Sequence, residues 1–145
     1  MTSERGPTRK RVVVVVEDDR PIGELLASLI NNEAGYAAIH VLRPSEALET
    51  LKTIVPDLLV LDVGLPGMSG IELYDKVRED ERLRGVPVVF ETAVSHEHRK
   101  EFKRRGIDTV IQKPFELDEI LRCMHRLAPP FVRERIGDRA GQHVH

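Results

Sequence analysis

Residues 12–19 read Val-Val-Val-Val-Val-Glu-Asp-Asp. Five consecutive valines predict a strand that is buried on both faces, because a strand with one solvated face alternates apolar and polar residues. The run stops abruptly at three acids, Glu17, Asp18 and Asp19. A buried strand with acidic side chains at its carboxyl end is typical of a parallel sheet that carries its site at that edge.

Four more segments repeat this arrangement. They are short and apolar, and the stretches between them carry apolar residues at helical spacing. The segments occupy residues 36–41, 58–61, 87–90 and 109–112. Strands that are separated by helices pair in parallel through right-handed crossovers. We therefore predict an α/β fold, a three-layer sandwich of five βα units around a five-stranded parallel sheet.

The chain of 145 residues has the size of one domain. We expect that domain at 11–128, after an N-terminal tail at 1–10 and before a flexible C-terminal tail at 129–145. A net charge of −2 and the absence of Trp argue against direct nucleic-acid binding. The apolar runs are far shorter than the ~18 residues of a membrane span, and no secretory signal is evident. We expect a cytoplasmic protein without membrane contact.

Further polar residues follow the other strands of the predicted sheet. Asp62 comes after the third strand, Glu91 and Thr92 come after the fourth, and the fifth strand ends in Gln112 and Lys113. These strand ends meet at one edge, where ligands bind in open parallel sheets. Ligands that are all oxygen favour Mg²⁺ or Mn²⁺ over zinc. A carboxylate can also attack a phosphoryl group, and a metal, a lysine and a hydroxyl would then hold the phosphoryl oxygens.

Four segments resemble the receiver domains of two-component response regulators. They are VVVEDD at 14–19, LDVGLPGMSG at 61–70, Thr92-Ala93, and Lys113-Pro114-Phe115. They stand in the order and spacing of that family, and the resemblance covers about residues 11–128. It implies a flavodoxin-like fold with strand order 2-1-3-4-5 and a cis bond before Pro114.

The resemblance also implies an acceptor and its metal ligands. Asp62 resembles the phosphate acceptor, and Lys113 resembles the lysine that pairs with it and then with the phosphate. Asp18 resembles a direct Mg²⁺ ligand, and Glu17 an acidic neighbour that acts on the metal through water. The expected metal site contains Asp62 as well, together with the backbone carbonyl of Gly64. No other cofactor is expected.

Three more positions concern the switch and its pocket. Thr92 resembles the hydroxyl that bonds the phosphoryl group, and the small Ala93 leaves the phosphoryl pocket open. Val110 stands where the family commonly has Tyr or Phe. We therefore expect the usual aromatic part of the switch to be altered here.

The function implied is a phosphorylation-operated signalling switch. A histidine kinase or a phosphotransfer protein would donate the phosphoryl group, and the switch would change the face that binds a downstream protein. We expect a stand-alone receiver without a DNA-binding output domain, which catalyses only its own Mg²⁺-dependent phosphorylation and dephosphorylation. The mixed charges of residues 99–105, Asp118 and Glu119 permit a homodimer through the last two helices and strand five without requiring one.

Two other functions use parts of the same pattern. A haloacid-dehalogenase-like phosphatase also forms an aspartyl phosphate, but that family needs a second aspartate at the position of Gly64. A degenerate receiver would bind partners without phosphorylation. The intact set of Asp62, Thr92 and Lys113 argues against it, while Val110 keeps it open.

Overall fold

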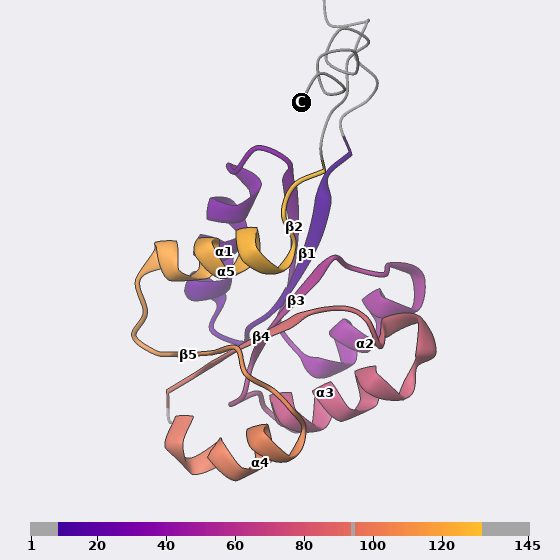
Figure 1. The fold of residues 1–145 in the computed structure, drawn as a ribbon, viewed down its shortest axis with the longest axis vertical. Coiled ribbons are helices and arrows are strands. Elements are labelled where there is room, and N and C mark those ends of the chain that lie inside the picture. Colours follow the sequence, from indigo (N-terminus) through magenta and orange to yellow (C-terminus); the bar gives the residue numbers. More distant parts are fainter. Residues whose placement is uncertain (1–8, 94, 132–145) are drawn as a thin grey trace, which may run out of the picture.

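The computed structural model describes residues 9–93 and 95–131. Figure 1 shows a central sheet with helices on both of its faces. The strands are β1 (Arg11–Val16), β2 (Tyr36–Val41), β3 (Leu58–Asp62), β4 (Val88–Thr92) and β5 (Val110–Gln112). The α-helices are α1 (Arg20–Asn31), α2 (Pro44–Thr53), α3 (Gly70–Glu79), α4 (Arg99–Arg104) and α5 (Leu117–Leu127). Short 3-10 turns occupy Glu81–Leu83 and Ser95–His98.

The sheet has the predicted topology. Its order is β2-β1-β3-β4-β5, and each neighbouring pair is parallel. Helices α1 and α5 lie on one side of it, and α2 and α3 lie on the other, with α4 at the bottom of the view in Figure 1. Phe102 of α4 belongs to the same hydrophobic cluster as residues of α2 and α3. The fold class and the strand order expected from the sequence are therefore confirmed.

The valine run supplies both hydrophobic cores. Val14 and Val16 pack with α2, α3 and Phe102 of α4, whereas Val13 and Val15 pack with α1 and α5. All four side chains are fully buried. Side chains alternate between the faces of a strand, so a strand with helices on both sides is apolar at every position.

The chain segment after β4 differs from the prediction. The sequence predicts one helix that Ser95 caps, that continues through Arg105 and that stops at Gly106. The structure instead has a 3-10 turn followed by the short helix α4. Phe102 is the buried residue of α4. Most helical stability in proteins comes from packing an apolar face, and this segment has little of one. The predicted stop at Gly106 is present, with a φ of 70°.

The two expected tails lie mostly outside the described residues. Of their described part, Phe131 lies beneath two guanidinium groups, with the Cζ atoms of Arg9 and Arg11 3.9 and 3.6 Å from its ring centre. Arg11 Nε also donates a hydrogen bond of 2.6 Å to the carbonyl of Pro129. The chain just after α5 is thus held against the start of β1. Within the described ranges, no helix combines the length and the hydropathy that crossing a membrane requires.

Helix α3 begins against the end of β3. Ser69 and Glu72 form a capping box, in which each side chain accepts a hydrogen bond from the backbone N–H of the other residue. Gly70 donates its N–H to the carbonyl of Val63 at 2.9 Å. A Cβ at position 70 would lie 2.2 Å from the backbone oxygen of Asp62. The helix therefore reaches the strand end that carries Asp62 only because residue 70 has no side chain.

We predict that Gly70→Ala lowers the free energy of unfolding by about 1–3 kcal/mol, the usual cost of forcing extra atoms into a packed site. Urea denaturation followed by far-UV circular dichroism measures it. Gly85→Ala is the matched control, because a Cβ at Gly85 meets no atom within 4 Å. Equal midpoints for the two variants would contradict the close approach.

Candidate functional site

Four polar side chains line one face of the sheet at its carboxyl edge. Each comes two residues after a buried apolar residue on the face that α1 and α5 cover, and residues two apart on a strand share a face. The pairs are Val15 and Glu17, Val60 and Asp62, Val89 and Glu91, and Ile111 and Lys113. The backbone hydrogen bonds of the sheet continue one residue past β1 and β5. Glu17 N–H donates to the carbonyl of Val41, and Lys113 N–H donates to the carbonyl of Thr92. The fold thereby brings three acids and a lysine into one row.

Lys113 lies among these three acids. Its Nζ is 3.1 Å from Glu17 Oε1, 3.4 Å from Asp62 Oδ2 and 3.4 Å from Glu91 Oε1. Burial by itself would lower the pKa of Lys113, but the hydrogen bond to Glu17 and the charges of Asp62 and Glu91 together raise it above its ordinary value. The ammonium group therefore stays charged in this site.

The carboxyl groups are difficult to ionise together. Burial, followed by the charge of Glu17, raises the pKa of Asp62, and Lys113 opposes this rise. Burial and the neighbouring Glu17 raise the pKa of Glu91 to about 9. Glu17 and Glu91 are 0% exposed and Asp62 is 6% exposed. A single ammonium does not compensate this many acids, so the arrangement favours a further cation.

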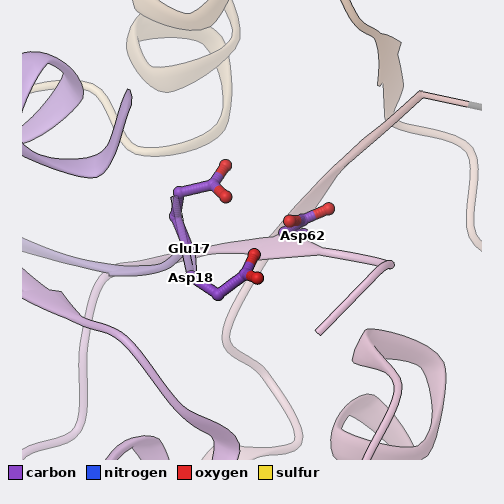
Figure 2. Close-up of side chains that lie close together, drawn as sticks. All are labelled: Glu17, Asp18 and Asp62. Atoms are coloured by element: carbon purple, nitrogen blue, oxygen red, sulfur yellow. The ribbon is translucent and has the colours of Figure 1, made fainter. Parts of the chain in front are cut away.

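Three of the predicted metal ligands come together. Glu17, Asp18 and Asp62 each offer a carboxylate oxygen, and these oxygens lie within 4.8 Å of one another. Figure 2 shows Glu17 and Asp18 at the end of β1 and Asp62 at the end of β3. Hard oxygen donors of this kind fit Mg²⁺. The N–H of Gly64 donates to Asp62 Oδ1 at 3.1 Å, which places Gly64 beside Asp62.

Asp19 has a structural partner instead. Its side chain accepts a hydrogen bond from the N–H of Ile22 at 3.1 Å and so caps α1. Its own N–H donates to Glu17 Oε2 at 3.0 Å. Asp19 thus orients the loop of the acidic cluster.

The predicted switch residues lie near this row of acids and lysine but are not part of it. Thr92 is buried at the end of β4, and its carbonyl accepts the N–H of Lys113 at 2.8 Å. Ala93 follows it and is exposed. Val110 is half-buried and, with α4 residues that include Phe102, lines a surface hollow of about 320 Å³. Val110 therefore adjoins α4 rather than the acidic cluster.

Glu91 is the site residue to which sequence reasoning assigned no role. The sequence places it at a strand end beside Thr92 but does not predict its contact with Lys113. The signal that could have found it is parity: Glu91 follows Val89 by two residues on a strand predicted to be buried. Both of its carboxylate oxygens are buried, and neither makes a hydrogen bond in the described part of the chain.

Comparison with known proteins gives the same family that the sequence motifs resemble. The family described as response regulator receiver domain matches residues 13–125. The polar-differentiation response regulator DivK of Brucella ovis is 32% identical over 110 residues, which cover 75% of this chain and 89% of DivK. PhoB of Rhizobium meliloti, a phosphate regulon transcriptional regulatory protein, is 36% identical over 83% of this chain and 54% of its own length.

Solved structures agree with the sequence relatives. The receiver domain of the Francisella response regulator 1452 has a TM-score of 0.73 and 28% identity, and covers 82% of this chain and 97% of that one. The chemotaxis protein CheY4 of Vibrio cholerae has a TM-score of 0.75 and 26% identity, and covers 81% and 98%.

Many relatives are longer proteins. This chain spans 8% of hybrid signal transduction histidine kinase D of Dictyostelium discoideum and 48% of PhoB of Pseudomonas aeruginosa. What is shared throughout is the receiver domain, a module of signalling rather than of metabolism that binds Mg²⁺ at an acidic pocket. The match over residues 13–125 and the strand order establish that this chain belongs to the receiver-domain family of two-component response regulators.

Proposed function

We propose that this receiver accepts a phosphoryl group on Asp62. The observation that carries the proposal is the position of Asp62, which is almost fully buried between the Lys113 ammonium and the oxygens of Glu17 and Asp18. A carboxylate oxygen of Asp62 attacks the phosphorus of a phosphohistidine, and the bond to the imidazole nitrogen breaks with its electron pair leaving on that nitrogen.

The remaining site residues hold the transferred group. Lys113 neutralises charge on the phosphoryl oxygens, and the Thr92 hydroxyl bonds one of them, since phosphoryl transfer depends on positioning and electrostatics. Mg²⁺, when bound by Glu17, Asp18, Asp62 and the Gly64 carbonyl, supplies further positive charge. The exposed Ala93 leaves room for the group. The domain in this way catalyses its own phosphorylation and dephosphorylation.

The output is a change in protein binding. Phosphorylation adds a charge of roughly −1.5 to −2 beside the end of β4. We propose that Thr92 follows this charge and moves the loop toward α4, which alters the face that a downstream protein or a second copy of the chain binds. The 89% coverage of DivK supports a stand-alone receiver, comprising residues 11–128. We further propose that it acts in the cytoplasm without contacting nucleic acid or membrane.

We propose that the donor, a histidine kinase or a phosphotransfer protein, docks on an apolar groove beside the site. The groove measures about 420 Å³, and it is lined by Ile22, Leu25, Leu26, Ala93, Lys113, Pro114, Phe115 and Leu117. Lys113 and Ala93 thus border both the groove and the phosphoryl pocket. A protein seated in the groove would present a phosphohistidine directly to Asp62, and Leu25, 50% exposed, would contact it.

The acceptor assignment is tested with acetyl phosphate and Mg²⁺. Wild type should gain one phosphoryl group by intact mass, and Asp62→Asn should gain none because it lacks the nucleophilic carboxylate. Asp19→Asn is the control: it removes a nearby acid but keeps a good helix cap, so it should be phosphorylated as wild type is. A folded wild type that gains no phosphoryl group contradicts the proposed function.

The metal assignment is tested by calorimetric titration with Mg²⁺, which suits a chain without Trp. Asp18→Asn should weaken Mg²⁺ binding by at least about tenfold, because even supporting groups of metal sites contribute that much. Asp19→Asn should bind Mg²⁺ nearly as tightly as wild type. Unchanged affinity in Asp18→Asn would remove this residue from the metal site.

The docking groove is tested with two exposed aliphatic residues. Leu25→Glu should slow transfer from a phosphorylated histidine phosphotransfer protein by about tenfold or more, while the reaction with acetyl phosphate stays unchanged. Val55→Glu is the control, since Val55 is 49% exposed but lies in a different hollow, beside Arg11 and Pro87. Equal transfer rates in the two variants would show that the donor docks elsewhere.

A further inference from the structure

Glu91 is the buried acid that the proposed chemistry does not use. We propose that Glu91 is a positioning residue, whose carboxyl oxygen holds the Lys113 ammonium beside Asp62. This inference rests on the proposed function, because it concerns how the acceptor site is arranged before the phosphoryl group arrives.

The backbone fixes where Glu91 lies. It pairs in register with Asp62 across β3 and β4, so the two side chains extend from neighbouring positions on the same face of the sheet. Lys113 follows β5 on the other side of β4 and reaches back over this strand. Glu91 therefore lies between the strand of the acceptor and the strand of the lysine.

The contacts show what Glu91 does there. The Lys113 ammonium donates a hydrogen bond of 3.1 Å to Glu17 Oε1. It also lies 3.4 Å from a carboxyl oxygen of Asp62 and 3.4 Å from one of Glu91. A lysine side chain is a flexible four-carbon stem, so the position of its ammonium group is set by the groups around it. The contact with Glu91 holds the ammonium over β4, the strand between Lys113 and the strand of Asp62.

The energetics argue that Glu91 is not present for stability. It is 0% exposed and neither of its oxygens makes a hydrogen bond among the described residues, which is a costly state for a carboxyl group. Replacing buried ionic groups with apolar residues of similar size is often neutral or stabilising. A leucine at position 91 should therefore fold at least as well, and the acid is better explained by its contact with Lys113.

The first test compares two substitutions in the reaction with acetyl phosphate and Mg²⁺. Glu91→Leu should slow phosphorylation of Asp62 by about tenfold, because small displacements of a positioned group are expensive in rate. Glu91→Gln, which keeps an acceptor oxygen, should remain within about threefold of wild type. A wild-type rate in folded Glu91→Leu, or an equal loss in Glu91→Gln, overturns the proposal.

The second test asks whether Glu91 acts through Lys113. In a Lys113→Ala background, Glu91→Leu should change the rate by less than about twofold, since the group that it positions is gone. Independent and additive losses would overturn the proposal. Thermal melting checks that each variant folds, and Glu91→Met replaces Glu91→Leu if the leucine variant does not.

A third measurement does not require phosphorylation. The ¹⁵N resonance of Lys113 Nζ should be sharp in wild type and Glu91→Gln, and broadened or shifted in Glu91→Leu. An unchanged resonance in Glu91→Leu overturns the positioning role. This readout separates the two proposals: a wild type that takes no phosphoryl group defeats the proposed function, whereas an unmoved Lys113 defeats only the role of Glu91.

Discussion

The contact between the Lys113 ammonium and the carboxyl groups of Glu17, Asp62 and Glu91 is the interaction on which the site depends. These four side chains come from the ends of β1, β3, β4 and β5, strands that are far apart in the sequence. The acids repel one another, and burial keeps the pKa values of Asp62 and Glu91 above their ordinary values. An acid with a raised folded-state pKa makes the fold less stable as pH rises from the unfolded pKa toward the folded one. The sheet therefore holds the cluster together at a cost in stability, and Lys113 reduces that cost.

The cores above and below the sheet make this arrangement possible. Val13 to Val16 are buried on alternate faces, so β1 is fixed in register between β2 and β3. A slip of one residue would turn Glu17 to the opposite face of the sheet, away from Lys113. Helix α3 adds a second restraint, because Gly70 brings its first turn against the backbone of Asp62. The position of each carboxyl group is thus a consequence of apolar packing that lies outside the site.

Much of this could be predicted from the sequence, for identifiable reasons. A run of valines has one reading in a protein with helices on both faces, and the ends of parallel strands must meet at one edge, so Asp62 and Lys113 could be placed together. The position of Glu91 follows from the same parity, yet its contact depends on the direction of a long lysine side chain, which no spacing encodes. The sequence predicts too long a helix after β4, because the length of this helix depends on how much apolar surface Phe102 and its neighbours bury. The stacking of Phe131 under Arg9 and Arg11 could not be predicted, because it joins two ends of the domain whose sequences give no sign that they meet.

The contacts of α4 bear on how a signal would leave the site. Helix α4 is short. Its Phe102 packs on Phe90 with 5.3 Å between ring centres, and Arg105, the residue after the helix, pairs with Asp75 of α3 at 2.7 Å. Val110 offers no ring to move between a buried and an exposed position. An aromatic contact to α4 instead comes from β4 itself, through Phe90, two residues before Thr92 and on the same face of the strand. In the proposed switch, a shift of Thr92 toward the phosphoryl group would therefore reach α4 along β4 and through Phe90, without a step through β5.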